Sequence, residues 1–365
     1  MTTSVRIDTP GPPPPTGHAL LEVENLHVEF RTRDGVAKAV NGVSYQLQAG
    51  KTLAILGESG SGKSVSAQAV MGILDSPPGF ITAGQIRFDG RDLLTMPEKE
   101  RRQIRGERIS MVFQDALSAL NPVYSVGFQI AEMFRVHRDV SRKEGMAKAV
   151  ELMDRVQIPA AKSRVKDYPH EFSGGMRQRI MIAIAIALDP DVLIADEPTT
   201  ALDVTVQAQV MALFSDLLKD SNTGLILITH DLGVVADVAD EIAVMYAGRI
   251  VEHAPVADIY ARPAHPYTQG LLASIPRVDR KGQDLYAIDG LPPTLTRIPK
   301  GCTFHPRCSR VQDNCRVDVP PLYDVGGTRA SACHYWEDVL AESASAAQTD
   351  GTATSVKTVQ GEGRG

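Results

Sequence analysis

The sequence predicts an α/β fold built around a largely parallel β-sheet. Residues 52–56, 192–195 and 225–229 are short apolar runs, each with the length and composition of a buried strand. Residues 204–218 lie between the last two runs and have the spacing of a helix. Because strands that alternate with helices pair in parallel, this order favours a sheet covered by helices.

Further strands and helices follow from the patterning of the other segments. Residues 21–30 and 39–47 alternate apolar and polar side chains, which is the period of a half-buried strand. Residues 147–156 have the spacing of an amphipathic helix. Residues 179–188 are good helix formers and end at Asp189-Pro190, which is a helix stop signal.

Composition divides the chain into parts. Residues 1–19 are polar and include a run of prolines, so we predict a flexible, disordered lead and not a secretion signal. Residues 20–275 carry the α/β pattern, and no internal repeat divides them. In residues 276–340 prolines and cysteines increase and periodicity fades, which indicates a small Cys-rich C-terminal domain. Residues 341–365 are rich in Ser, Ala, Thr and Gly, so we predict a disordered tail.

Charge and hydropathy narrow the possible functions. The chain has 365 residues, 43% apolar residues and a net charge of −6, which argues against a general nucleic-acid binder. The apolar stretch at residues 181–188 is far shorter than the roughly 20 residues that a membrane-spanning helix needs. We therefore predict a cytoplasmic chain that does not cross a membrane and reaches one only through partner chains.

A glycine-rich loop follows the predicted strand 52–56 and precedes a predicted helix. Its sequence, Gly-Glu-Ser-Gly-Ser-Gly-Lys-Ser at 57–64, fits the P-loop pattern G-x-x-x-x-G-K-[ST]. Glycines allow the backbone to curl so that several N–H groups point at one phosphate chain. Lys63 is expected to reach the β- and γ-phosphates of a nucleotide, and the Ser64 hydroxyl to bind Mg²⁺. A plain glycine turn is the alternative, but the strand before it and the helix after it favour a phosphate site. The candidate nucleotide-binding residues of this loop are Gly57, Glu58, Ser59, Gly60, Ser61, Gly62, Lys63, Ser64 and Val65.

Polar residues also follow three other apolar runs. Asp196 and Glu197 come directly after 192–195, where α/β sheets keep their ligands. We expect Asp196 to hold Mg²⁺ and Glu197 to act as the general base for the attacking water. His230 is a candidate contact to the γ-phosphate and the water, and Gln114 a candidate sensor of Mg²⁺ or the water. Solvated loop residues are the alternative for each.

With these motifs the chain resembles the nucleotide-binding domains of ABC transporters over residues 20–275. The P-loop, Gln114, Ser173-Gly-Gly-Met-Arg-Gln178, Asp196-Glu197, Ala201-Leu-Asp203 and His230 occur in the order of that family. The resemblance implies a P-loop NTPase core (RecA-like) with an antiparallel β subdomain and a helical subdomain. It also implies an ATPase that uses ATP and Mg²⁺.

The resemblance further implies that the chain works in pairs. Ser173, Gly174 and Gly175 would begin a helix and bind the γ-phosphate of ATP held by a second subunit, and Asp203 would also cross that interface. A simple serine helix cap is a structural role that remains true beside this one. The family also stacks an aromatic residue on adenine; Phe30 is the candidate, with a core phenylalanine as the alternative.

The signature reads Phe-Ser-Gly-Gly-Met and not Leu-Ser-Gly-Gly-Gln, which resembles the dipeptide and oligopeptide importers. Residues 168–179, 195–207, 265–272 and 299–308 also look like that branch. The implied partners are a second ATPase subunit in a heterodimer, two transmembrane permease subunits contacted through residues 115–170, and an extracytoplasmic peptide-binding protein. The chain would lie peripherally at the cytoplasmic face of the membrane. Related importers of nickel or other solutes are an alternative. A soluble ABC ATPase acting on ribosomes or DNA is less favoured, because the chain has one ATPase unit and no inserted coiled coil or zinc module.

The four cysteines of the chain, Cys302, Cys308, Cys315 and Cys333, lie in one short segment. Four thiolates can complete a tetrahedral zinc site or hold a [4Fe–4S] cluster. No Cys-x2-Cys pair is present, which weakens the zinc interpretation. Some peptide importers carry an iron–sulfur cluster in this region, and this resemblance favours the cluster. Free thiols or disulfides remain alternatives, and His305 and His334 are candidate substitute ligands or neighbours.

Overall fold

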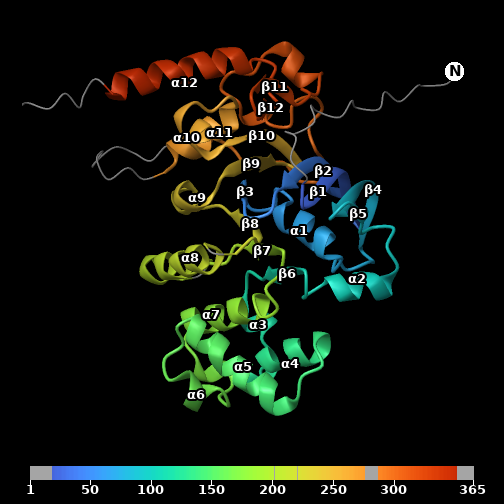
Figure 1. The fold of residues 1–365 in the computed structure, drawn as a ribbon. Helices are drawn as coiled ribbons and strands as arrows, with labels where there is room; N and C mark the ends of the chain where they lie inside the picture. The colour runs from blue at the N-terminus through green and yellow to red at the C-terminus, as the bar shows by residue number, and fades with distance from the viewer. Residues whose placement is uncertain (1–18, 201, 220, 276–286, 352–365) are drawn as a thin grey trace, which may run out of the picture.

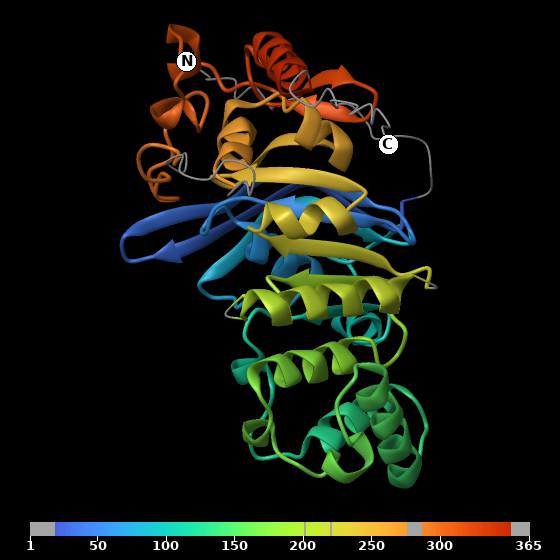
Figure 2. The same cartoon turned by 90° about the vertical axis from the view of Figure 1, so that its left-hand side faces the viewer.

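The protein combines two β-sheets with a separate group of helices (Figure 1). The structure, a computed structural model, describes residues 19–200, 202–219, 221–275 and 287–351. One sheet has the strand order β2-β1-β4-β5, and the other has the order β11-β12-β10-β9-β3-β8-β7-β6. The turned view shows the helical part at one end of the molecule and the C-terminal segment at the other (Figure 2).

The first sheet is antiparallel and packs one face on an apolar core. In β1 the side chains of Leu21, Val23, Leu26 and Val28 are buried, which is the alternation that the sequence predicts. β1 pairs with β2 on one side and with β4 on the other. The strands are β1 (Leu21–Thr32), β2 (Gly35–Leu47), β4 (Gly79–Phe88) and β5 (Arg91–Asp92).

The centre of the second sheet is parallel and positions the functional residues. β3 pairs in parallel with β8 and β9, and β7 pairs in parallel with β6 and β8. Every residue of β7 and β8 is buried, as expected for strands covered on both faces. The carboxyl ends of these strands therefore meet at one edge of the sheet. The strands are β3 (Thr52–Leu56), β6 (Ile109–Val112), β7 (Val192–Asp196), β8 (Gly224–Thr229) and β9 (Glu241–Tyr246).

Helices follow the parallel strands and also form a group of their own. α1 (Lys63–Met71), α8 (Val204–Leu218) and α9 (Leu232–Val238) follow β3, β7 and β8. The helical group lies beyond β6 and β7 (Figure 1). It comprises α3 (Ala116–Ala119), α4 (Val126–His137), α5 (Arg142–Arg155), α6 (Ala161–Arg164), η1 (Pro169–Glu171) and α7 (Gly174–Ala185), whereas α2 (Glu98–Ile104) precedes β6. No helix among the described residues has the length and apolar character needed to cross a membrane.

The C-terminal segment joins the main sheet. β10 (Arg249–Pro255) pairs antiparallel with β9 and also with β12 (Arg329–Ser331), which in turn pairs with β11 (Tyr323–Gly326). Without β12, the outer edge of β10 would present unpaired backbone groups. This segment is therefore bonded to the core and is not merely appended to it. Its helices are α10 (Val256–Ala261), α11 (Pro266–Ala273), η2 (His305–Arg307), η3 (Asp313–Arg316) and α12 (Trp336–Gly351).

The prediction of a disordered tail is wrong for residues 341–351. α12 continues helical from Trp336 to Gly351, because its alanines favour a helix and its first turns dock on the core. Val339 is fully buried, and the Ser343 hydroxyl donates to the Pro263 carbonyl oxygen at 2.9 Å. The predicted lead, apart from the buried Ala19, lies outside the described residues, and so do 276–286 and the tail beyond 351.

Candidate functional site

The loop between β3 and α1 has a backbone that only glycine can adopt at two positions. Gly62 has a φ of 104°, and a Cβ there would lie 2.1 Å from the Ala39 carbonyl oxygen. A Cβ on Gly57 would lie 2.2 Å from the Met245 carbonyl oxygen. The Ser61 hydroxyl is buried and has no hydrogen-bond partner among the residues that the structure describes. The loop is thus packed tightly on β2 and β9, and it keeps one buried polar group free for a ligand.

Lys63 places its ammonium group over this loop. Its Nζ donates to the carbonyl oxygens of Gly57 at 2.7 Å and of Glu58 at 3.0 Å. Burial lowers the pKa of Lys63, and the carboxylates of Glu197, Asp196 and Glu58 counteract that effect. A buried ammonium group next to a curled backbone loop is suited to binding a polyphosphate chain.

A hydroxyl and a carboxylate meet beside the loop. The Ser64 Oγ donates to Oδ1 of Asp196 at 2.8 Å, across 132 residues of sequence. Asp196 is the last residue of β7, and burial raises the pKa of its carboxyl group while the Ser64 hydrogen bond opposes that rise. Two adjacent oxygen ligands of this kind fit Mg²⁺, which usually takes few protein ligands besides phosphate and water.

The carboxylate of Glu197 is the meeting point of several polar groups. Its Oε2 accepts hydrogen bonds from Nε2 of Gln114 and from Oγ1 of Thr200, both at 2.9 Å. Nδ1 of His230 lies 3.6 Å from the same oxygen. Glu197 itself has a positive φ of 44°, and its N–H donates to the Ile228 carbonyl oxygen at 2.8 Å, which ties it to β8. The predicted Gln114, Glu197 and His230 therefore come together, and Thr200 is a neighbour that the sequence analysis missed.

The serine–glycine signature lies away from this site in the same chain. Ser173 caps α7 by accepting from the Met176 N–H at 3.4 Å, and Asp203 caps α8 by accepting from the Val206 N–H at 3.0 Å. In the described part of the chain, no hydrogen bond or ion pair joins residues 173–175 or Asp203 to the P-loop. Figure 1 shows α7 and α1 in separate parts of the molecule.

Comparison with known proteins decides the family. Residues 40–200 match the family model described as "ABC transporter", and residues 251–315 match "Oligopeptide/dipeptide transporter, C-terminal region". The chain is 49% identical over 320 residues to the oligopeptide transport ATP-binding protein OppD of Salmonella typhimurium, covering 88% of this chain and 95% of that protein. The chain belongs to the ABC transporter family of ATP-binding proteins. It is also 51% identical over 310 residues to OppD of Bacillus subtilis, covering 85% of this chain and 87% of that one.

Solved structures of ABC proteins share the fold. The ATP-binding cassette MJ0796, in a dimeric structure bound to ADP and Pi, aligns with a TM-score of 0.58 at 24% identity, over 65% of this chain and 98% of that one. The cbiO1 protein of Clostridium perfringens aligns with a TM-score of 0.57 at 28% identity, over 67% and 92% of the two chains. The predicted P-loop NTPase fold with its antiparallel and helical parts is confirmed.

Phe30, the candidate adenine contact of this ABC protein, lies on β1. Its side chain is partly buried and packs against the apolar core of the antiparallel sheet. A Cβ built on Gly79 would lie 3.1 Å from Cε1 of the Phe30 ring, so the two residues are in close contact. This packing agrees with the core alternative, and the adenine contact stays a prediction.

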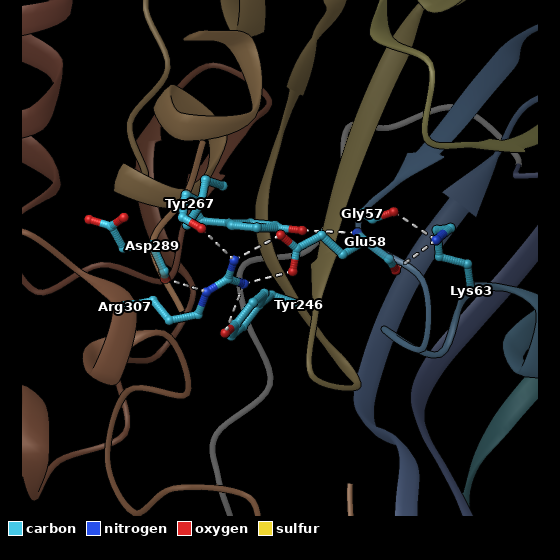
Figure 3. Close-up of polar contacts among 8 residues, drawn as sticks. Gly57, Glu58, Lys63, Tyr246, Tyr267, Asp289 and Arg307 are labelled. Atoms are coloured by element: carbon cyan, nitrogen blue, oxygen red, sulfur yellow. Dashed lines mark hydrogen bonds and ion pairs between the residues drawn. The ribbon is translucent and has the colours of Figure 1, made fainter. Parts of the chain in front are cut away.

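Two residues of the C-terminal half reach the P-loop without any signal in the sequence. The Tyr267 hydroxyl accepts from the Glu58 N–H at 2.9 Å, across 209 residues. The Arg307 guanidinium pairs with the Glu58 carboxylate at 2.7 and 3.0 Å, across 249 residues (Figure 3). Glu58, predicted to bind the nucleotide, therefore turns its side chain toward the C-terminal region.

The four cysteines of this ABC protein are free thiols that line one small cavity together with His305 and His334. Burial raises the pKa of Cys302 to about 11 and of Cys333 to about 12, and it also raises the pKa of Cys308. Within the described ranges, no three His, Cys, Asp or Glu side chains are grouped so that they could hold a metal ion. Both ring nitrogens of His334 have partners, since they contact the Tyr323 hydroxyl and the Asp318 carbonyl oxygen.

Proposed function

We propose that this chain is the ATP-binding and ATP-hydrolysing subunit of an ABC importer of oligopeptides. The observation that carries the proposal is the gathering of Lys63, the Ser64–Asp196 pair and the Gln114–Glu197–His230 group at the carboxyl edge of one parallel sheet. The relatives named for oligopeptide transport match nearly the whole length of the described core, which supports the cargo class.

The residues divide the work of hydrolysis between binding and proton transfer. The curled loop and Lys63 bind the β- and γ-phosphates and offset their charge. Ser64 and Asp196, with Gln114, would hold Mg²⁺, which neutralises negative charge on the phosphates when it is bound.

Glu197 serves as the general base. Gln114 and Thr200 fix its carboxylate by donating to Oε2, which leaves the other oxygen to accept a proton from the attacking water. The water oxygen bonds to the γ-phosphorus as the bond to the ADP oxygen breaks. His230, whose ring lies next to Glu197, would contact the departing phosphate.

A second ATPase subunit completes each site. Among the described residues, Ser173, Gly174, Gly175 and Asp203 make no hydrogen bond or ion pair with the P-loop of their own chain, which supports a role toward the partner's nucleotide. The start of α7 presents backbone N–H groups and the serine hydroxyl, which suit a phosphate. We infer a heterodimer in which two different ATPase chains face each other in this way.

The helical group offers a surface for the membrane subunits. A groove of about 720 Å³ is lined partly by Val123, Tyr124, Phe128 and Tyr168, together with basic residues such as Lys143. Val123 is 70% exposed and Tyr124 48% exposed, and apolar exposure of this kind marks a protein contact. We infer that a cytoplasmic segment of a permease docks here, which holds the chain at the cytoplasmic face of the membrane. An extracytoplasmic binding protein would deliver the peptide.

The decisive experiment uses substitutions at the carboxyl edge. Glu197→Gln is expected to bind ATP, to stop hydrolysis and to trap a dimer by size-exclusion chromatography, whereas Lys63→Ala is expected to lose ATP binding. Asp191→Asn is the matched control, because Asp191 precedes the opposite end of β7 and pairs with Arg108 at 2.6 Å. Undiminished turnover in Glu197→Gln would remove it as the base, and import of nickel but not peptide by the reconstituted transporter would overturn the cargo.

We further propose that the four thiols hold a [4Fe–4S] cluster. The sulfurs of a tetrahedral zinc site lie about 3.8 Å apart, given zinc–sulfur bonds of about 2.3 Å, and the sequence has no Cys-x2-Cys pair of the kind that zinc sites favour. The thiols instead surround a shared cavity, as ligands of separate iron atoms would. A backbone N–H two residues further along favours the thiolate of Cys302, Cys308 and Cys333 in turn.

Metal analysis separates the possible occupants of the cavity. Protein purified without oxygen is expected to be brown and to contain about four iron and four sulfide per chain. Cys315→Ser, which removes the most buried of the ligands, should lower both contents together. Colourless protein with one zinc per chain, or with no metal and four free thiols, would overturn the cluster.

A further inference from the structure

The P-loop carries an acid that is paired with an arginine from the far end of the chain. Arg307 donates from Nη1 and Nη2 to the two carboxylate oxygens of Glu58 at 2.7 and 3.0 Å, which is a bidentate geometry (Figure 3). The Arg307 side chain is 6% exposed and that of Glu58 26% exposed, so water screens the pair only partly. In Figure 3 the Glu58 side chain points toward Arg307, while Lys63 lies on the other side of the loop.

Contacts other than the one to Glu58 also hold the Arg307 guanidinium in place. Its Nε donates to the Asp289 carbonyl oxygen at 3.0 Å, and Nη2 donates to the Ile288 carbonyl oxygen at 3.3 Å. The Tyr246 hydroxyl lies 3.5 Å from Nη1. Because these contacts fix the planar fork, little side-chain entropy is lost when it binds the carboxylate.

The backbone of Glu58 is fixed by the same region. Its N–H donates to the Tyr267 hydroxyl at 2.9 Å, and the Tyr267 ring packs against Tyr246 and Phe304 with centroids 4.7 and 5.3 Å away. Phe304 is 3% exposed and directly precedes η2, the turn that carries Arg307. The backbone and the side chain of one P-loop residue are thus both anchored to the C-terminal half of the chain.

The charge of Glu58 explains why its contact with Arg307 matters for nucleotide binding. A polyphosphate is strongly negative, so a free carboxylate in its cradle repels it. The Lys63 ammonium donates to the Glu58 carbonyl oxygen at 3.0 Å, so the residue that carries this carboxylate borders the phosphate site. Pairing with Arg307 cancels the charge of Glu58 and directs its carboxylate outward.

We propose that Arg307 is a positioning residue for nucleotide binding, through which the C-terminal region sets the charge and conformation of the P-loop. This proposal rests on the proposed ATPase function of the same site. Arg307 touches no nucleotide in this arrangement; it acts by neutralising Glu58 and holding it away from the phosphates.

The test is a double-mutant cycle on the full-length chain. Arg307→Gln is expected to weaken binding of a fluorescent ATP analogue about tenfold, which corresponds to about 1.4 kcal/mol. The KM for ATP should rise by a similar factor with little change in kcat, because the lost interaction serves binding and not the transition state. The double variant Glu58→Gln with Arg307→Gln should regain most of the affinity, since it contains no unpaired charge. Arg307→Lys, which keeps the charge but loses the fork, should be intermediate.

Arg329→Gln is the matched control. Arg329 is also a buried arginine of the C-terminal region, at 8% exposure, and it pairs with Asp258 at 3.5 Å, away from the P-loop. If Arg307 only stabilised the fold, both single variants would lose thermal stability and neither would change nucleotide affinity. That result would overturn the proposal, as would a double variant no better than Arg307→Gln. Failure of the parent chain to bind ATP, or binding that survives Lys63→Ala, would instead reject the proposed function.

Discussion

Glu252 gives a prediction in which the pH dependence of folding can be calculated from one buried carboxyl group. It lies on β10, is 1% exposed, and accepts the Ala264 N–H at 2.6 Å through Oε1. Burial raises its pKa from 4.5 to about 7, although hydrogen bonds and the nearby charge of Arg329 oppose the rise. The folded state therefore binds a proton that the unfolded chain has already released between these two pH values.

The sign and size of the pH dependence of stability follow from proton linkage. A carboxyl group with a raised folded pKa contributes stability below pH 4.5, and that contribution is lost as the pH rises to about 7. The two pKa values differ by about 2.5, which at about 1.36 kcal/mol per unit gives about 3 kcal/mol. His265 acts in the opposite direction, because burial lowers its pKa from 6.5 to about 3, so stability rises with pH over much of the same range.

The substitution Glu252→Gln isolates the carboxyl term because it keeps the shape and removes the charge. The free energy of unfolding of the variant should equal that of the parent at pH 4.5 and exceed it by about 3 kcal/mol at pH 8. His265 is present in both proteins, so its contribution to stability cancels in the comparison. Urea unfolding followed by the fluorescence of Trp336, the single tryptophan, reports on this region, since α12 follows the strand β12 that pairs with β10. A difference between variant and parent that stays constant from pH 4.5 to 8 would refute the reasoning.

Three further substitutions test other contacts. Phe304→Ala removes a ring that is 3% exposed, and we expect the free energy of unfolding to fall by about 3–5 kcal/mol in the same urea assay; a loss below about 1 kcal/mol would contradict that packing. Gly62→Ala would place a Cβ 2.1 Å from the Ala39 carbonyl oxygen and should abolish ATP binding in a nucleotide titration, so parent-like affinity would show that the loop can relax. Thr200→Val removes a hydrogen bond to Glu197 and should lower kcat about tenfold, or about 1.4 kcal/mol, with the KM for ATP unchanged; a raised KM with kcat unchanged would point to a binding role instead.

The gathering of the site residues was predictable because a simple rule of sheets governs it. Gln114, Glu197 and His230 each follow an apolar run, and those runs became the neighbouring parallel strands β6, β7 and β8. Thr200 was not predictable, because a hydroxyl in a turn is common and its contact depends on the positive φ of Glu197.

The C-terminal contacts could not be predicted from sequence patterns, for a different reason. β11 and β12 have only four and three residues, which is too short for the alternation of a strand to be visible. The segment therefore looked like an appended unit, although it extends the main sheet. Arg307 pairs with Glu58 across 249 residues, and no local period links two residues so far apart.

Through these contacts the C-terminal segment supports the part of the chain that carries the P-loop. The C-terminal segment supplies the neighbour of β10, a ring to the aromatic cluster beneath the P-loop, and the counter-charge of Glu58. Each of these groups would be left unpaired or exposed if the segment were displaced, and a buried polar group without its partner costs about 1–3 kcal/mol. Cys308, which lines the thiol cavity, directly follows Arg307 in the chain. A change at the thiols that shifted this turn would therefore act on nucleotide affinity through Glu58, and not through the carboxyl edge where Glu197 works.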